Sequence, residues 1–344
     1  MTTKTLRTGG GLSLRYEPRA ALCGLGLILL TLGLGIVLVG TGDFPMTPGE
    51  VVDTLLGRGT VVQEFAVLEL RLPRVLVAIL VGGALALGGA VFQSISRNPL
   101  GSPDVIGFGQ GATVGALTVI VLFQGSAVAT ALGAVVGGVV TGVAIYLLAW
   151  KRGVHGYRLV LVGIGAAAML TSVIHYLITK ANLTDATRAT VWMTGSLEGR
   201  DWTQFWPLLA VCCVLVPLVL GHGRALRMLE MGDDAAYALG VKVERTRIVL
   251  MASAVLLVAV ATSAAGPIVF VSLSAPQLAR RLTRAPGPNL AVSALMGSAL
   301  LLGADWIAGN AFGERQLPVG VITGILGGCY LLWLLVSERK AGRI

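Results

Sequence analysis

The stretch RLPRVLVAILVGGALALGGAVFQSISRNPLGSPDVIGFGQGA, Arg71–Ala112, holds the pattern that decides the fold. An apolar run of membrane-spanning length ends in the polar turn Arg97–Pro103, and a second, Gly-rich apolar run follows it. Pro99 and Pro103 interrupt regular helix, and Pro103 suits the first turn of the next helix. Asp104 would then lie near the positive end of that helix dipole. The stretch predicts two membrane helices joined by a short capped turn.

The composition of the whole chain points the same way. Of its 344 residues 55% are hydrophobic and only 12% are charged, with a mean hydropathy of +0.83. Soluble domains carry about a quarter charged residues, and uncharged stretches near 20 residues are typical of membrane-spanning helices. We therefore expect an all-α polytopic membrane protein and exclude a large soluble core.

Ten apolar runs have the length of candidate membrane helices. The predicted spans are residues 20–41, 73–95, 103–123, 127–150, 158–179, 203–221, 246–265, 267–283, 289–309 and 318–337. The first run is too long for a signal peptide and lacks a clear cleavage site, so we expect it to be retained. The seventh and eighth spans meet at Gly266–Pro267, which predicts a tight hairpin. The domain organisation is a segment 1–19, one transmembrane domain 20–337 and a tail 338–344.

The basic residues are distributed unevenly about these spans. With the N-terminus placed in the cytoplasm, 19 of the 26 basic residues fall inside and 7 fall outside. This asymmetry follows the positive-inside rule and predicts that both termini are cytoplasmic. It also explains the net charge of +9 without a nucleic-acid partner. We expect a multi-pass protein of the plasma (inner) membrane, in contact with membrane lipid.

Glycine spacing predicts close helix packing, because small residues four apart let helix backbones approach. The sets with this spacing are Gly107, Gly111 and Gly115; Gly133 and Gly137; Gly138 and Gly142; and Gly320, Gly324 and Gly328. The four cysteines lie inside apolar runs without metal-type spacing, so we interpret them as buried small apolar residues.

Several motifs, taken in order, resemble one family. They are the opening stretch, WMTGSLEGRDW (Trp192–Trp202), LEMGDDAAYALGVKVERTR (Leu229–Arg247), AGPIVFVSLSAPQLARR (Ala265–Arg281), GAD (Gly303–Asp305) and QLPVGVITGILGG (Gln316–Gly328). Together they resemble the iron-siderophore and vitamin B12 (FecCD-type) family of ABC importer permeases. The likeness is strongest to the G-type permease subunits of ferric enterobactin importers. It implies a type II ABC importer permease fold of about ten helices with inverted half-repeats.

The resemblance assigns a coupling role to the longest predicted cytoplasmic loop, residues 222–245. Gly232 and the acids after it can begin a short helix, with the acids at its positive end. By resemblance this helix sits in a cleft of the ATPase subunit. The alternative is an ordinary loop helix on the membrane surface. The candidate coupling residues are Leu229, Gly232, Asp233, Asp234, Ala235, Ala236, Tyr237, Leu239 and Gly240.

Two arginines on the predicted outer face, Arg71 and Arg74, run against the positive-inside trend. In the family the arginines of this RLPR motif meet acidic residues of a soluble substrate-binding protein, which would steer encounter and fix register. Interfacial snorkelling is the alternative. A further outer arginine found in some relatives after the GAD motif is not matched, and Arg315 is a candidate substitute.

The resemblance implies two further regions. Residues 154–158 correspond to the family's cytoplasmic gate region, with Val154, His155, Gly156 and Tyr157 as candidates, and residues 184–198 predict a short outer helix carrying Trp192. A simple connector is the alternative for both. The chain departs from the family at Ser272 and Gln277, where Gly and His are usual, so no role of that histidine is carried over.

Asp305 is the clearest charge inside an apolar span, and such residues are costly unless paired or functional. We expect it to make a structural hydrogen bond to a neighbouring helix end, and we interpret His175 as a satisfied residue of the bundle. A proton relay would need a chain of acids or histidines, and only these two residues stand out. No P-loop, catalytic triad, thiol pair or H-E-x-x-H motif is present, so we predict no catalytic site, no metal site and no directly bound cofactor.

The sequence thus predicts the permease subunit of an ATP-binding cassette importer that moves a ferric siderophore of catecholate, enterobactin-like type. The implied partners are a paralogous permease subunit, two copies of a cytoplasmic ABC ATPase that carry ATP and magnesium, and an extracytoplasmic siderophore-binding protein. The alternatives are the same family with a haem or cobalamin substrate, and an ion-coupled secondary transporter, which also uses broken helices. A membrane-embedded enzyme is disfavoured by the lack of a catalytic constellation.

Overall fold

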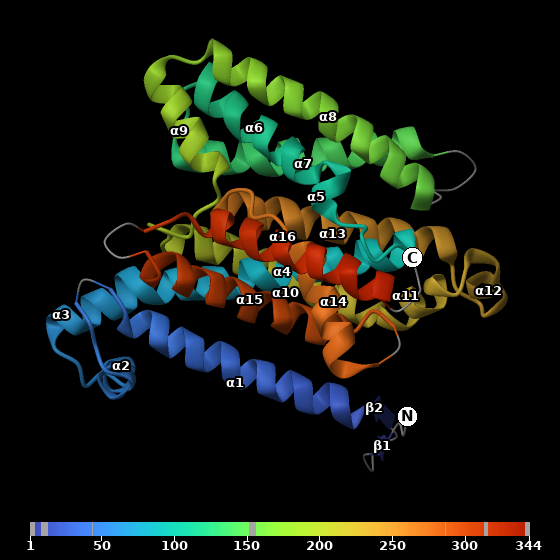
Figure 1. Ribbon diagram of the computed structural model, residues 1–344, viewed down its shortest axis with the longest axis horizontal. Helices are drawn as coiled ribbons and strands as arrows, with labels where there is room; N and C mark the ends of the chain where they lie inside the picture. The colour runs from blue at the N-terminus through green and yellow to red at the C-terminus, as the bar shows by residue number, and fades with distance from the viewer. Residues whose placement is uncertain are drawn as a thin grey trace.

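A computed structural model describes residues 4–7, 13–42, 44–150, 156–285, 287–312 and 316–340, and these ranges are almost entirely helical (Figure 1). Two short strands, β1 (Lys4–Arg7) and β2 (Ser13–Tyr16), pair antiparallel ahead of the first helix. The helices are α1 (Pro18–Gly40), α2 (Pro48–Leu55), α3 (Val61–Glu64), η1 (Phe65–Arg71), α4 (Leu72–Ser96), α5 (Pro103–Ile106), α6 (Phe108–Leu122), α7 (Ala127–Ala149), α8 (Gly156–Lys180), α9 (Leu183–Met193), α10 (Trp202–Gly221), α11 (Gly223–Glu230), α12 (Asp233–Ala238), α13 (Val243–Ala265), α14 (Val271–Thr283), α15 (Leu290–Asn310) and α16 (Val319–Lys340).

The predicted all-α membrane fold is confirmed, whereas the count of ten spans is not. Within the described ranges seven helices are long and apolar enough to cross a membrane: α1, the continuous α3–η1–α4, α7, α8, α10, α13 and α15. The apolar helices Phe108–Leu122 and Val319–Leu334 are shorter. The predicted span 267–283 is a helix of 13 residues, which is about 20 Å long and falls short of a hydrocarbon core of about 30 Å.

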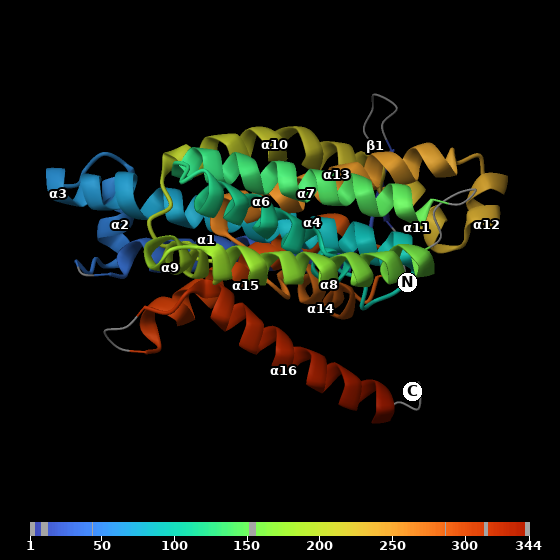
Figure 2. The same ribbon diagram turned by 90° about the horizontal axis from the view of Figure 1, so that it is seen from above.

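The helices lie roughly parallel in layers (Figure 1). The upper layer of that view holds α6, α7, α8 and α9, the middle layer is built around α4, and α1 lies below. In the middle layer α4 packs on α15, α13, α14 and α10, while α13 also packs on α7 and so joins the two layers. Seen from above, α16 projects away from this body (Figure 2). The central helices α4 and α13 are therefore the ones buried on most sides.

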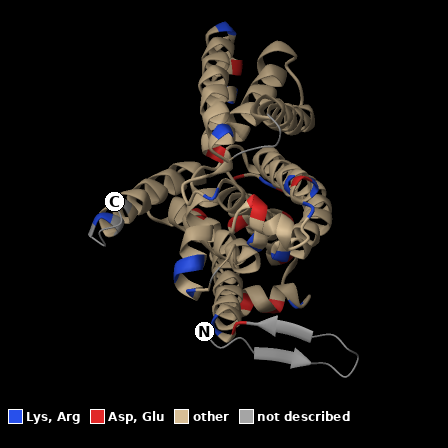
Figure 3. Ribbon diagram, turned by 90° about the vertical axis from the view of Figure 1, so that its right-hand side faces the viewer, with Lys and Arg blue, Asp and Glu red and all other residues tan. Residues whose placement is uncertain are grey.

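The bundle has two ends that differ in their elements. The start of α1, the end of α16, and α11 and α12 lie at one end, here called the α12 end (Figure 1). The helices α2 and α3 lie at the opposite end, here called the α2 end. Viewed with the α12 end toward the reader, the ribbons are mostly tan and the charged residues gather near helix ends (Figure 3). Helix α4 runs the whole length, from Leu72 at the α2 end to Ser96 at the α12 end.

The predicted glycine contacts hold for α6 and α7. A methyl group added at Gly115 would overlap the carbonyl oxygen of Gly133, and one at Gly111 would overlap the side chain of Thr141. On another face of α7 a methyl at Gly138 would crowd Ala259 of α13. The fourth set, Gly320, Gly324 and Gly328, is only partly confirmed, because nothing lies close to Gly328.

The turn 97–103 forms as predicted, with one difference. Arg97 ends α4 in the left-handed region at φ 52°, and Pro103 occupies the first turn of the next helix, capped by the Ser102 side chain. The predicted span 103–123 is broken, however, because Gly107 has φ +97° and separates α5 from α6. Asp104 also does more than complement a helix dipole, since its carboxylate accepts a hydrogen bond of 2.5 Å from the Ser272 hydroxyl. The departure from the family at Ser272 thus ties α5 to α14.

The hairpin at Gly266–Pro267 is confirmed. Gly266, at φ +76°, ends α13, and α14 begins at Val271. The helix predicted over residues 184–198 forms as α9, which ends at Met193. In the segment that follows it, the Ser196 amide donates to the Ala265 carbonyl at 2.8 Å and so holds the hairpin in place. The turn is therefore shielded by neighbouring backbone, as irregular structure inside a membrane requires.

Two interpretations of single residues are wrong. Only Cys212 is buried among the four cysteines; Cys23 is half-buried, and Cys213 and Cys329 are exposed because α10 and α16 each leave a face of the single chain uncovered. His175 is exposed on α8 rather than satisfied within the bundle, because most of the surface of α8 is left uncovered in the single chain.

Candidate coupling and docking sites

The short helix α12 has well-defined ends. Gly232, at φ +116°, separates it from α11, a backbone conformation that disfavours other residues. At its other end Gly240, at φ +82°, follows Leu239, and the Val241 amide donates to the Ala236 carbonyl at 3.0 Å. This is the glycine-ended helix terminus expected when the chain must reverse. The predicted helix with an acidic first turn is therefore present, and its role in coupling stays a prediction.

Helix α12 has an inner and an outer face. Ala236 is fully buried on the inner face, as is Leu229 of the preceding helix α11. Tyr237 and Leu239 are 78% and 56% exposed, and Asp234 is also exposed. Aromatic side chains are enriched at protein–protein interfaces, so the outer face of α12 is a candidate contact surface.

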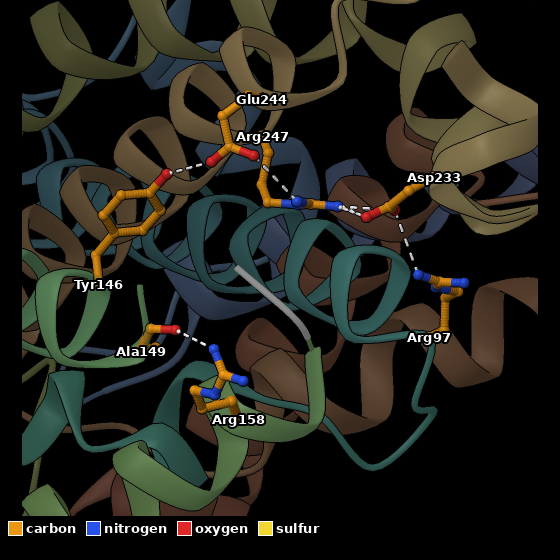
Figure 4. A network of polar contacts seen from close by, with 7 residues as sticks. All are labelled: Arg97, Tyr146, Ala149, Arg158, Asp233, Glu244 and Arg247. Atoms are coloured by element: carbon orange, nitrogen blue, oxygen red, sulfur yellow. Dashed lines mark hydrogen bonds and ion pairs between the residues drawn. The ribbon is translucent and has the colours of Figure 1, made fainter. Parts of the chain in front are cut away.

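Asp233 belongs to the inner face and is the centre of a polar network (Figure 4). Both of its carboxylate oxygens accept hydrogen bonds of 2.8 Å from Nη2 of Arg247. Arg97, at the end of α4, donates to the same carboxylate at 3.3 Å. The Arg247 side chain is only 5% exposed, whereas that of Asp233 is 33% exposed. The network therefore joins α12 to both central helices.

The network continues from Arg247 along α13 to the upper layer. Nη1 of Arg247 lies 3.3 Å from Oε2 of Glu244, one turn earlier on α13. The other carboxylate oxygen of Glu244 accepts a hydrogen bond of 2.8 Å from the Tyr146 hydroxyl of α7. Figure 4 shows these side chains in one line from α7 to α12.

A second polar cluster lies beside the first, at the same end of α4. The Ser94 hydroxyl donates to Glu230 of α11 at 2.6 Å. Gln93, almost fully buried, donates to the Leu273 carbonyl and accepts from Gln277 at 3.0 Å and from Arg280 at 3.3 Å. Gln277, the residue at which the chain departs from the family, also donates to the Pro99 carbonyl at 2.8 Å. The end of α4 is thus bonded to α11, α12 and α14.

The α2 end holds the two arginines of the RLPR motif. Arg71 donates to the carbonyl oxygens of Val39 and Phe44, both at 2.8 Å, and so ties η1 to the segment at the end of α1. Arg74, in the first turn of α4, forms a two-pronged ion pair with Asp305 of α15, with distances of 2.8 and 3.1 Å. The expectation that Asp305 bonds to a neighbouring helix end is confirmed, in the form of a charged pair.

An open cleft of about 440 Å³ lies over this ion pair. Its walls come from α1, η1, α4 and α15 and include Arg71, Arg74 and Asp305. The Arg74 side chain is 27% exposed and Asp305 is 1% exposed, so the pair shows the solvent its positive member. The arrangement suits an acidic group that approaches from outside the bundle.

The remaining predicted residues are only partly described. Val154, His155 and Arg315 lie outside the described residues. Gly156 begins α8 and packs on the backbone of Ser96, where a methyl group would crowd it, and Tyr157 is 81% exposed. Among the described residues no group of three or more His, Cys, Asp or Glu side chains is placed to hold a metal ion.

The sequence analysis missed the residues that organise the α12 end. Arg247 was counted only as a basic residue on the inner side, and Glu230, Glu244 and Tyr146 carried no prediction. One signal was available: an acid and an arginine three apart, at 244 and 247, share one helix face. Spacing of this kind does not show which partner is buried, because burial depends on α7 and α12.

The fold and these two ends define a polytopic helical membrane protein of the transport permease class. Residues 27–337 match the FecCD transport family, and the chain belongs to that family. It is 45% identical over 300 residues to the ferric enterobactin transport system permease protein FepG of Escherichia coli (strain K12), covering 87% of this chain and 91% of that protein. The family membership predicted from the motifs is confirmed.

Two further similarities agree with this assignment. The vitamin B12 import system permease protein BtuC of Escherichia coli O9:H4 (strain HS) is 33% identical over 329 residues, covering 95% of this chain and 97% of that protein. Among solved structures, the inward-facing conformation of a metal-chelate type ABC transporter superposes with a TM-score of 0.81 at 25% identity, covering 92% of this chain and 99% of that chain. The chain therefore has the fold of an ABC transporter permease.

Proposed function

We propose that the chain is one half of the membrane pathway of an ABC importer for a ferric siderophore of the catecholate, enterobactin-like type. The observation that carries this proposal is the 45% identity to a ferric enterobactin permease over most of both chains. Haem and cobalamin are the alternative cargoes. Because the chain is 33% identical to a vitamin B12 permease, cobalamin uptake is measured beside uptake of the ferric chelate. The iron would travel inside its chelate as cargo.

The outer face of α12 is the proposed contact with the ATPase. The exposed Tyr237 and Leu239 would enter a cleft of that subunit, with Asp234 beside them. We infer two ATPase copies, one for this chain and one for a paralogous permease subunit that completes the pathway. The proposal agrees with the excess of basic residues on this side, which supports a cytoplasmic location for α12 and both termini.

The cleft over Arg74 is the proposed docking site for an extracytoplasmic siderophore-binding protein. An acidic side chain of that protein would enter the cleft and approach Arg74 on the side that Asp305 leaves free. Arg71 borders the same cleft, and Arg315 is a proposed contributor. Charge reversal at Arg74 would also disturb Asp305, so the cleaner test removes the acidic groups of the binding protein.

The segment 154–157 is the proposed cytoplasmic gate region. The support for it is the close approach of Gly156 to Ser96, at the end of α4 that carries the bonds to α11 and α12. A movement of α12 would reach this segment through α4.

Reconstituted transport tests the proposed function. This chain, its partner permease and the ATPase would be placed in proteoliposomes with the binding protein outside, and uptake of radioactive ferric enterobactin would be compared with uptake of haem and cobalamin. We expect uptake of the ferric chelate that requires ATP. Uptake that persists without nucleotide and follows an ion gradient would support a secondary transporter instead, and preference for cobalamin would change the cargo.

A further inference from the structure

The link between α12 and α13 is short and mostly exposed. It consists of residues 239–242, of which Leu239, Gly240 and Lys242 are exposed, and Gly240 has φ +82°. If an ATPase moved α12, this link by itself would allow the helix to swing without displacing α13. A second connection is therefore needed if the movement is to reach the bundle.

Arg247 supplies that connection. Nη2 of its nearly buried guanidinium group donates to both oxygens of Asp233 at 2.8 Å, and Nη1 lies 3.3 Å from Glu244, so one planar group holds both carboxylates in a fixed relation. A buried charge is strongly held by its partner, because separation would leave it unpaired in a medium of low dielectric. Arg247 lies one turn inside α13, the helix that packs on α4, α7 and α10.

The bonds around this pair reach the helices that would have to move. Glu244 connects Arg247 to Tyr146 of α7, and Arg97 connects Asp233 to the end of α4. Asp233 is thus held from two directions while its neighbour Asp234 and Tyr237 point to the outside. The outer face of α12 is thus available for contact with a partner, while its inner face connects the helix to the bundle.

We propose that Arg247 is a positioning residue that fastens α12 to α13, so that a displacement imposed on α12 is passed to α13, α7 and α4 rather than absorbed by residues 239–242. The inference rests on the proposed coupling role of α12. It concerns the inner face alone: loss of Arg247 leaves the outer face intact and removes the transmission.

The experiment measures import per ATP hydrolysed in the complete reconstituted transporter. Arg247→Gln, which keeps polarity and removes the charge, is compared with Arg247→Lys and with the matched control Arg245→Gln, two positions earlier on α13 and exposed. We expect Arg247→Gln to retain the ATPase subunit while import per ATP falls about tenfold, a loss within the range for residues that couple two sites. Arg247→Lys should recover part of it, because an ammonium group keeps the charge but lacks the planar fork.

Two results would overturn the proposal: an import-to-ATP ratio for Arg247→Gln within twofold of the unaltered protein, or an equal fall for Arg245→Gln. If Arg247→Gln does not assemble, the ratio is measured in Asp233→Asn under the same criterion, since this isosteric change removes the carboxylate charge while leaving α13 unaltered. Tyr237→Ala separates this inference from the proposed function. If Tyr237→Ala retains the ATPase and full import, the outer face is not the coupling surface, whatever Arg247 does.

Discussion

The two ends of the molecule each carry an arginine–aspartate pair, and the pairs are built in opposite senses. At the α2 end the acid is buried and the base is partly exposed, since Asp305 is 1% and Arg74 is 27% exposed. At the α12 end the base is buried and the acid is partly exposed, since Arg247 is 5% and Asp233 is 33% exposed. The α2 end therefore shows the positive member of its pair to the surroundings, whereas at the α12 end the acid is the more exposed member and is also bonded by the exposed Arg97.

The difference in burial determines which member of each pair is structurally critical. Removal of the exposed member leaves a buried charge without its partner, which is strongly destabilising, whereas removal of the buried member leaves a charge that can turn toward water. In each pair, then, the more exposed member is the one whose loss leaves a buried charge behind. Only at the α2 end is that member also the residue proposed to meet a partner protein.

The largest effect is expected from Arg74→Ala. Asp305 is 1% exposed and would lose the one ion-pair partner that the described part of the chain gives it. Loss of one member of a buried pair costs about 3–5 kcal/mol of unfolding free energy. We expect a marked fall in the thermal midpoint of the purified protein in detergent, and a lower yield from the membrane.

A second variant decides whether stranded charge is the cause. In Arg74→Leu/Asp305→Leu both charges are gone, and apolar replacement of a buried pair is often neutral. Recovery of most of the thermal midpoint in this double variant is expected. An equal loss in the single and double variants would mean that packing, and not the unpaired carboxylate, accounts for the change.

Asp233→Ala tests the opposite pair and should have a smaller effect. Arg247 would lose the bonds at 2.8 Å but would keep Glu244 at 3.3 Å. We expect a loss of about 1–2 kcal/mol in unfolding free energy, because the buried charge retains one partner. The same thermal measurement applies, and Glu244→Ala added to Asp233→Ala should remove the remaining partner and bring the loss close to that of Arg74→Ala. A double variant no less stable than Asp233→Ala would show that Glu244 does not support Arg247.

Much of the fold could be predicted from the sequence. Apolar runs and proline positions gave the helices, the turn 97–103 and the hairpin at Gly266, because these depend on local chemistry. The break at Gly107 was missed, since a glycine within an apolar run reads equally well as a packing residue. The short helix α14 was taken for a span because hydropathy does not reveal that neighbouring helices enclose it.

The site was predictable where it lies within one segment and unpredictable where it joins several. The helix α12 and its acidic start follow from Gly232 and the residues after it. The partners of Asp233 and Asp305 come from helices distant in sequence, such as Arg74 at a separation of 231 residues. A single sequence contains no signal for such pairing, because burial and direction are properties of the assembled bundle.

The smallest predicted effect concerns the N-terminal caps of the short helices α2 and α3 at the α2 end. It tests whether the charged Glu50 stabilises α2 independently of the pair of Arg74 and Asp305. Glu50 accepts hydrogen bonds from the backbone amide of Thr47 at 2.7 Å and from its hydroxyl at 2.8 Å, and these bonds lower the pKa of Glu50 below its ordinary value of 4.5. A carboxyl group whose pKa is lowered on folding contributes stability above its unfolded pKa and loses it as the pH falls through the folded value. Hydrogen exchange at the amides of α2, corrected for the intrinsic rate, should therefore accelerate as the pH falls below about 4.5.

Helix α3 is the matched control, because its capping box uses Gln63, which does not titrate and accepts from Thr60 at 2.9 Å. In Glu50→Gln the two helices should respond alike; if α2 still frays in acid in that variant, the proton acts at another group, and the Glu50 cap is not the acid-sensitive contact of this helix.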